Sequence, residues 1–196
     1  MSTIRLCCFF LALALAGCAS QPDHLAPEDD LSDESWTLVD RDSAAVAFPD
    51  DLLGQPVLLS AIYTHCPDVC LMTMANMVNV RRELGADTAG VTFATVSFDP
   101  ARDTPAVLRR YAETWRSGPD WRLLTGDSTE VAGLMERIGV RYEVSRRDTL
   151  ASGEATYSVS HTDKALLLDA EGRIVETYGG SAGIPEMIAD DIRALR

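Results

Sequence analysis

Mainly apolar stretches of strand length alternate with amphipathic segments along most of the chain. Residues 56–63 (PVLLSAIY) form a short, nearly continuous apolar run, which predicts a strand buried on both faces of a sheet. Residues 91–98 (VTFATVSF) are rich in β-branched and aromatic side chains and predict a second strand. Between the two, apolar residues at helical spacing over 71–84, followed by Gly85, predict a helix and its end.

The second half of the chain continues this alternation. Residues 104–115 begin with a hydroxyl residue and a proline, which predicts the start of a helix. Residues 121–124 predict a short strand, and residues 128–138 predict a helix capped by its first serine. Residues 141–157 are polar, and we expect a strand and an irregular excursion there.

The C-terminal part completes a recognisable order of elements. Residues 165–168 and 174–178 flank a turn of sequence DAEG and predict a hairpin, and a final helix begins near residue 184. This order predicts a thioredoxin-like α/β fold, with a central mixed β-sheet flanked by helices and a β-hairpin excursion.

The N-terminus follows a different pattern. Arg5 precedes an apolar run over 6–16, which is shorter than the roughly 20 apolar residues of a permanent membrane-spanning helix. The run ends in LAGC, which resembles the lipobox of bacterial lipoproteins. We therefore expect residues 1–17 to be a signal peptide and Cys18 to carry lipid. The domain would then be anchored to a bacterial membrane and lie in the periplasm, or otherwise outside the cytoplasmic membrane.

Residues 18–35 separate this anchor from the rest of the chain. The segment is acidic, contains two prolines and has few large apolar residues, so it cannot bury enough surface to fold alone. We expect it to be an acidic tether and residues 36–196 to form the domain.

The charge balance excludes one class of partner. The formal net charge is −13, and loss of Arg5 with the signal peptide makes it one unit more negative. Such a chain is repelled by nucleic acid and by anionic lipid headgroups. We expect no nucleic-acid partner, and membrane contact through the lipid anchor alone.

Cysteine usage isolates one pair of thiols. Five cysteines are encoded, of which Cys7 and Cys8 leave with the signal peptide and Cys18 carries lipid. Cys66 and Cys70 remain, directly after the first predicted strand, where α/β folds place ligands. Two thiols four positions apart indicate one cysteine site rather than a disulfide scaffold.

The spacing of this pair leaves three kinds of chemistry open. On one helical turn, residues four apart have Cβ atoms about 5–6 Å apart, close enough for a disulfide, a redox couple or one soft metal ion. Dithiol oxidoreductases of the thioredoxin type have two residues between their cysteines, whereas Cys66 and Cys70 have three.

Four segments resemble the SCO/SenC family. Residues 63–70 (YTHCPDVC) resemble its metal-binding motif, and residues 97–105 (SFDPARDTP) resemble its D-P-x-R-D-T-P signature. Residues 121–126 (WRLLTG) and 159–162 (VSHT) match further family segments in the same order. The similarity extends from about residue 48 to the C-terminus.

The resemblance implies a thioredoxin fold that binds copper through Cys66, Cys70 and His161. Two thiolates suit Cu(I), and an added imidazole also accommodates Cu(II). The implied function is that of a metallochaperone in the assembly of the copper A centre of cytochrome c oxidase. Its partner would be the oxidase subunit that carries this centre, or another copper enzyme.

Two other functions would use the same residues. A thiol–disulfide reductase would need Cys66 and Cys70 as its redox-active pair, to keep the cysteines of a copper-site partner reduced, but would not need His161. A copper-responsive signalling or storage protein would use all three side chains.

The chain departs from the family pattern beside two of these residues. Leu71 replaces a proline that commonly follows the second cysteine, which we expect to alter only the start of the helix. Ser160 replaces an aspartate that often precedes the histidine, which removes a possible hydrogen-bond acceptor for the imidazole of His161.

Other polar side chains in these segments have simpler interpretations. His24 is expected to be solvated in the tether, and His65 to lie at the edge of the site. Asp99 and Asp103 could assist a Cu(II) state, but turn and helix-cap chemistry is favoured for both. Core packing is favoured over thioether ligation for the methionines that follow the cysteines, which are Met72, Met74 and Met77.

Overall fold

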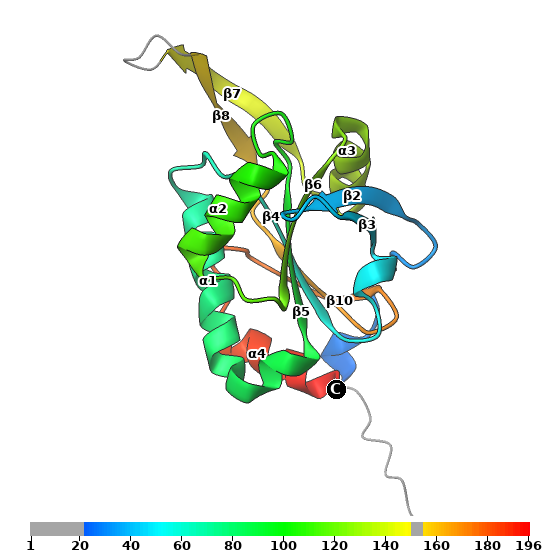
Figure 1. Ribbon diagram of the computed structural model, residues 1–196. Coiled ribbons are helices and arrows are strands. Elements are labelled where there is room, and N and C mark those ends of the chain that lie inside the picture. Colours follow the sequence, from blue (N-terminus) through cyan, green and yellow to red (C-terminus); the bar gives the residue numbers. More distant parts are fainter. Residues whose placement is uncertain (1–21, 150–154) are drawn as a thin grey trace, which may run out of the picture.

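The computed structural model describes residues 22–149 and 155–196 (Figure 1). Eight of its strands form the main sheet: β1 (Asp29–Asp30), β2 (Trp36–Asp40), β3 (Ala45–Phe48), β4 (Val57–Ile62), β5 (Thr92–Ser97), β6 (Trp121–Gly126), β9 (Ala165–Leu168) and β10 (Arg173–Tyr178). Their spatial order is β1-β10-β9-β4-β5-β6-β2-β3, with β4, β5 and β6 parallel and the other neighbours antiparallel. The predicted mixed sheet is therefore confirmed.

Four α-helices cover this sheet. They are α1 (Val69–Leu84), α2 (Pro105–Trp115), α3 (Ser128–Arg137) and α4 (Pro185–Ala194). In Figure 1, α1, α2 and α4 lie on one side of the sheet and α3 lies on the other. All four lie close to their predicted positions, but α3 is capped one residue earlier than expected, because Asp127 accepts the N–H of Thr129 at 2.8 Å.

The centre of the sheet is buried on both faces, as the apolar run predicts. Every residue of β4 and β5 is buried. Leu58 packs into the core beneath α1, α2 and α4, while its neighbour Leu59 packs into the core on the α3 side. Because successive side chains of a strand point to opposite faces, two such cores require a strand without polar alternation.

The main sheet brings three segments to one edge. β4 and β5 are parallel, so the residues that follow Ile62 and Ser97 emerge side by side. β9 runs antiparallel to β4 and begins at Ala165, opposite Ser60, so the residues that precede β9 reach the same edge. Segments distant in the sequence therefore meet at the carboxyl end of β4.

A separate hairpin projects from this edge (Figure 1). Its strands β7 (Tyr142–Thr149) and β8 (Ala155–His161) pair antiparallel, from Tyr142 opposite His161 outward. The structure confirms the predicted β-hairpin excursion, and it shows a second strand where an irregular segment was expected. The sequence pattern does not give the bounds of the first strand, because β7 is almost wholly exposed and carries no apolar alternation. The sequence pattern also predicted no strands at the positions of β2 and β3.

The start of the chain differs from the expectation of a free tether. Within residues 22–35, Leu25 and Leu31 are fully buried, and β1 adds a short strand to β10. Arg137 of α3 forms ion pairs with Asp29 and Glu34. This part of the segment is packed on the domain, because two apolar side chains and a few ion pairs suffice once a folded surface is present.

The signal peptide and the lipidated Cys18 lie outside the described residues. Within residues 22–149 and 155–196, no helix has both the length and the apolar character to cross a membrane.

A substitution in the N-terminal segment tests its packing. Leu31→Ala should lower the free energy of unfolding by about 2–5 kcal/mol, because it leaves a cavity in the core. Asp33→Ala is the matched control in the same segment, because Asp33 is exposed, and it should change stability little. Urea unfolding measures both, and equal stability of Leu31→Ala and the unmodified chain would contradict the packing.

Candidate metal centre

The two cysteines lie where β4 leads into α1. Cys66 lies in the turn before the helix, where its N–H donates to the carbonyl oxygen of Tyr63 at 3.3 Å. Cys70 is the second residue of α1. The spacing suggested that the two cysteines share one helical turn, but Cys66 lies before the helix and only Cys70 lies within it. The turn nevertheless folds Cys66 back, so that the N–H of Cys70 points to its Sγ at 3.5 Å.

A histidine from the hairpin completes a cluster of three ligand atoms. His161 is the last residue of β8, and its Nε2 lies 3.3 Å from Sγ of Cys70. The two sulfurs and a ring nitrogen all lie within 4.8 Å of one another. Cys66 and Cys70 are buried free thiols. The structure thus brings together the three residues selected from the sequence.

The imidazole is held in a tautomer suited to metal ligation. Nδ1 of His161 lies 3.0 Å from the carbonyl oxygen of Thr162. A carbonyl only accepts hydrogen bonds, so this contact assigns the proton to Nδ1 and leaves the Nε2 lone pair facing Cys70. The backbone of Thr162 therefore supplies the acceptor that the replacement of aspartate by Ser160 was expected to remove.

Aromatic rings surround the histidine. The ring of His161 lies 4.8 Å from that of Phe98 and meets the ring of Tyr63 edge-on at 6.1 Å. Tyr142, opposite His161 on β7, stacks on Phe98 at 5.2 Å. The Tyr63 hydroxyl accepts the N–H of Val159 at 3.2 Å. These contacts limit rotation of the imidazole and reduce its exposure to water.

Burial dominates the electrostatics of the Cys70 thiol. It raises the pKa of Cys70 well above the ordinary value of 9.0, and a weaker repulsion from Asp163 acts in the same direction. Without a metal, Cys70 is therefore a neutral thiol at neutral pH. A bound cation would compensate the thiolate charge, so metal binding and release of this proton are coupled.

The remaining histidines lie outside the cluster. The side chain of His65 is half exposed, and its Nδ1 lies 3.2 Å from Oγ1 of Thr64, which agrees with a place at the edge of the site. His24 is not simply solvated, because its Nε2 lies 2.8 Å from Oδ1 of Asp191.

The two aspartates are structural rather than ligating. Asp99 and Asp103 are buried, and hydrogen bonds to protein groups occupy their carboxylates. Met74 and Met77 are buried in the core, as favoured, while Met72 is 54% exposed.

Sequence reasoning missed several residues that shape the site. Tyr63, Phe98 and Arg102 were inside recognised motifs, which was the available signal, but the motifs did not show what these side chains contact. Tyr142 and Tyr157 had no such signal, and their positions depend on the hairpin and its contacts with the loop after β5.

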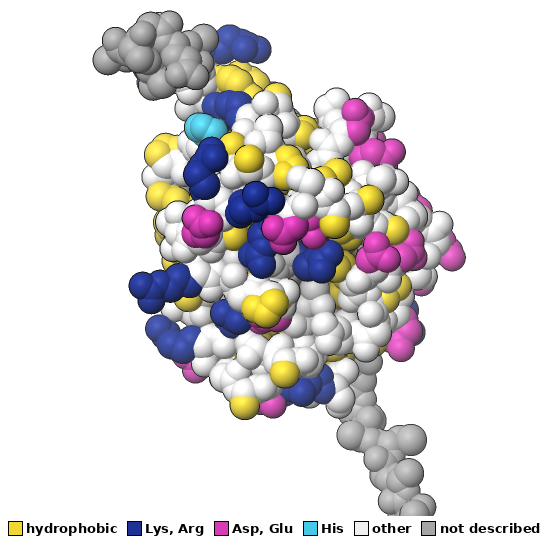
Figure 2. Space-filling model, in the orientation of Figure 1, with side chains coloured by type: hydrophobic (Ala, Val, Ile, Leu, Met, Phe, Trp, Pro, Cys, Tyr) yellow, Lys and Arg dark blue, Asp and Glu magenta, His cyan; other side chains and the backbone are white. Residues whose placement is uncertain are grey.

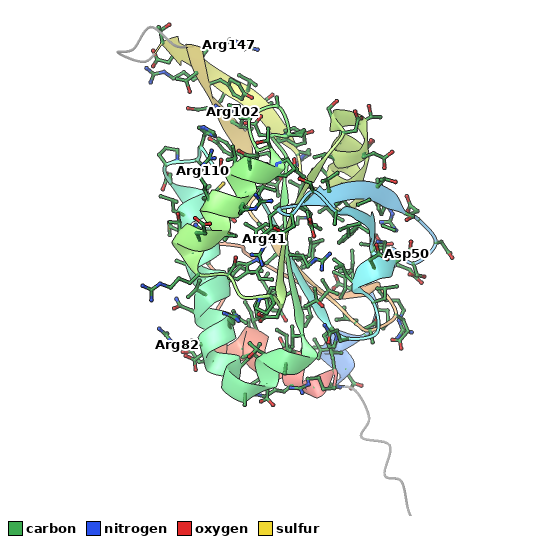
Figure 3. All side chains as sticks on the ribbon, in the orientation of Figure 1. Arg41, Asp50, Arg82, Arg102, Arg110 and Arg147 are labelled. Atoms are coloured by element: carbon green, nitrogen blue, oxygen red, sulfur yellow. The ribbon has the colours of Figure 1, made fainter. Side chains whose placement is uncertain are left out.

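Charge is unevenly distributed over the surface. Figure 2 shows dark-blue arginines over α2 and toward the hairpin, whereas acidic side chains gather on the opposite side of that view, toward β2 and β3. Arg102, Arg110 and Arg147 lie on the arginine-rich side (Figure 3). The net charge of −13 therefore does not describe the surface near the hairpin.

Comparisons with known proteins agree with this architecture. A family model described as SCO1/SenC matches residues 26–196. "Protein SCO2 homolog, mitochondrial" from Bos taurus is 32% identical over 145 residues, which are 73% of this chain and 52% of that protein. The chain thus spans about half the length of the curated relatives it matches first.

Solved structures extend the comparison to three dimensions. The structure of Bradyrhizobium japonicum ScoI with copper bound is 31% identical, with a TM-score of 0.70 over 83% of this chain and 98% of that one. Yeast Sco1 with copper bound is 25% identical, with a TM-score of 0.68 over 82% of this chain and 85% of that one.

The raised pKa of Cys70 predicts a loss of stability at alkaline pH for the reduced, metal-free protein. The unfolded chain releases this proton near pH 9, whereas the folded chain retains it, so deprotonation favours unfolding. The free energy of unfolding should therefore fall by up to about 1.4 kcal/mol per pH unit above pH 9. Below pH 9 the protonated Cys70 thiol makes its full contribution to the free energy of unfolding.

Urea unfolding of the unmodified chain and of Cys70→Ala, from about pH 8 to 10, isolates this contribution. The free energy of unfolding should fall less steeply with pH in Cys70→Ala than in the unmodified chain, because the variant lacks the thiol whose proton is lost on unfolding. Identical pH dependence in the two proteins would show that burial does not hold the proton on Cys70.

Proposed function

Because the chain belongs to the SCO1/SenC family, we propose that it binds one copper ion through Cys66, Cys70 and His161 and acts as a metallochaperone. One observation carries the proposal: two thiols and an imidazole nitrogen from segments far apart in the sequence lie within 4.8 Å of one another. The copper-bound relatives with the same fold support the choice of metal.

The donor set fits copper as the cargo. Two thiolates suit Cu(I), and an imidazole extends the site to Cu(II). Structural zinc sites more often have four protein ligands. Copper when bound supplies the positive charge that a buried thiolate lacks, and the chain supplies thiolates of Cys66 and Cys70 and the Nε2 lone pair of His161.

The surroundings prepare these atoms for binding. The N–H of Cys70, in the first turn of α1, points to Sγ of Cys66 and holds this sulfur beside the other two ligand atoms. The carbonyl of Thr162 keeps the proton of His161 on Nδ1. A cavity of about 390 Å³ opens beside His161 and gives a partner's ligand a route to the site.

The proposed partner is the cytochrome c oxidase subunit that carries the copper A centre, or another copper enzyme. Cys18, at the end of the lipobox-like segment, would hold the domain at a bacterial membrane, outside the cytoplasm. Family membership and the N-terminal sequence support this placement.

A thiol–disulfide reductase is the second candidate. Its support is that Cys66 and Cys70 are adjacent free thiols. In this reaction a thiolate attacks a partner's disulfide to form a mixed disulfide, and the second thiol resolves it. Two electrons and two protons pass to the partner, while Cys66 and Cys70 become linked.

Copper binding can be tested with single variants. The reduced chain should bind about one copper per molecule and show a strong sulfur-to-Cu(II) charge-transfer band. Cys66→Ser and Cys70→Ser should abolish Cu(I) binding, while His161→Ala should remove the normal Cu(II) band. His65→Ala is the matched histidine control and should bind copper normally. Stoichiometric copper without this band in the unmodified chain would refute the proposed site.

The two functions differ in their need for the histidine. In cells that assemble a copper-containing oxidase, a chaperone role predicts that His161→Ala impairs oxidase activity about as strongly as Cys66→Ser. The reductase alternative predicts impairment by Cys66→Ser alone, because thiol exchange does not use the imidazole. Immunoblots should first establish equal levels of both variants.

A further inference from the structure

The loop between β5 and α2 contacts both segments that carry the candidate ligands. It contains Asp99, Arg102 and Asp103, and it closes on itself where the N–H groups of Arg102 and Asp103 donate to the carbonyl oxygen of Asp99 at 3.1 and 2.9 Å. Of its three charged side chains, Asp103 contacts the cysteine segment, and Asp99 and Arg102 contact the strand that carries the histidine. Arg102 lies at the base of the hairpin, near the start of α2 (Figure 3).

One side chain of this loop holds the cysteine segment. The carboxylate of Asp103 is fully buried and accepts the N–H of Thr64 at 2.8 Å. It also accepts hydrogen bonds from the hydroxyls of Thr64 and Ser97, both at 2.5 Å. Bonds to a buried carboxylate are among the stronger hydrogen bonds in proteins. Thr64 lies two residues before Cys66, so this contact fixes the turn that carries the first cysteine.

The other two charged side chains hold the histidine strand. Asp99 accepts a hydrogen bond from the hydroxyl of Tyr157 at 2.6 Å and another from Nε of Arg102. Nη1 of Arg102 donates to the carbonyl oxygen of Tyr157 at 3.0 Å. The guanidinium carbon also lies 3.5 Å from the centre of the Tyr157 ring. Asp99 and Arg102 thus contact Tyr157 at three groups, which are its hydroxyl, its ring and its carbonyl.

The position of Tyr157 on β8 relates this contact to His161. Residues two and four apart on a strand share a face, so Tyr157, Val159 and His161 point to the same side. Among the strands of residues 22–149 and 155–196, β8 pairs with β7 and with none of the main sheet. A two-stranded hairpin has little stability of its own. The orientation of His161 therefore depends on the contacts between the hairpin and the domain.

We propose that Asp99 and Arg102 are positioning residues that hold His161 beside Cys70 through Tyr157, while Asp103 positions the cysteine turn from the same loop. The loop sets the separation between the two halves of the ligand set. For its consequence in copper binding, this inference rests on the function proposed above.

The arrangement predicts different effects on the two copper states. Cu(I) can be held by the two thiolates, which Asp103 and α1 keep in place. Cu(II) binding depends more on the imidazole, which is held through Tyr157. Loosening the contact between Asp99, Arg102 and Tyr157 should therefore weaken Cu(II) binding and leave Cu(I) binding near its normal strength.

Two conservative variants test the contact in the full chain, purified in detergent. Tyr157→Phe removes only the hydroxyl that donates to Asp99, and Arg102→Lys retains the charge but loses the planar fork. Tyr178→Phe is the matched control, because its hydroxyl also donates to a buried carboxylate, that of Asp191 at 2.8 Å, away from the cluster. Arg110→Lys is the control on exposed surface.

Two measurements are needed. In the metal-free protein, nuclear Overhauser contacts between the rings of His161 and Phe98 report the position of the imidazole. They should weaken in Tyr157→Phe and Arg102→Lys and persist in both controls. Titration should then show Cu(II) affinity reduced about 10- to 100-fold in the two loop variants, the range typical of lost outer-shell contacts.

The outcomes separate this inference from the proposed function. Normal ring contacts and normal Cu(II) affinity in both loop variants would overturn the positioning role. If the control Tyr178→Phe lost Cu(II) affinity equally, the effect would be general destabilisation, which also overturns it. An unmodified chain that binds no copper refutes the proposed function, and the ring contacts then decide the positioning role alone. If Arg102→Lys fails to fold, Tyr157→Phe decides.

Discussion

Burial of β4 and β5 on both faces is the constraint on which the rest of the molecule depends. Strands with no exposed face must be covered by helices on one side and by α3 with its neighbours on the other. Because β4 and β5 are parallel, both strands end at the same edge of the sheet. The cysteine turn after β4 and the loop after β5 therefore begin side by side. The candidate site therefore lies at this edge because of the packing, before any ligand chemistry is considered.

The site joins two halves that differ in how they are held. Cys66 and Cys70 lie close in sequence, in a short turn between a buried strand and a helix, and Asp103 of the loop after β5 anchors that turn. His161 is fixed at long range, at the base of a hairpin that has no partner in the main sheet. The cysteine half has one hydrogen bond to the hairpin, from the N–H of Val159 to the Tyr63 hydroxyl, whereas the histidine half depends on a few polar and aromatic contacts with the domain. Such contacts stabilise one orientation, yet they are few enough for a partner protein to displace.

Sequence patterns predicted the parts of the molecule in which local signals agree with the fold. The apolar run of β4, the helix that follows and the cysteine pair could be identified because each is contiguous. The hairpin was predicted only as an excursion without exact bounds, because β7 is polar, almost wholly exposed and without apolar alternation. The family motif located His161, but nothing local related it to Arg102 or Tyr157, which meet only after the chain has folded. The packed segment around Leu31 was missed because acidic neighbours outweigh one apolar side chain in any composition argument.

Burial of the thiols also bears on how a bound ion would leave. A thiolate at Cys70 is costly without a nearby cation, since burial raises the pKa of that thiol. On the proposed function, loss of copper would therefore be accompanied by return of a proton or by simultaneous binding to a partner's ligands. The cavity beside His161 is lined by residues at the base of the hairpin, so an incoming ligand would approach the cluster from the side of the histidine strand. Displacement of the histidine before the thiolates is then the order that exposes the least uncompensated charge, because the imidazole is neutral when it leaves.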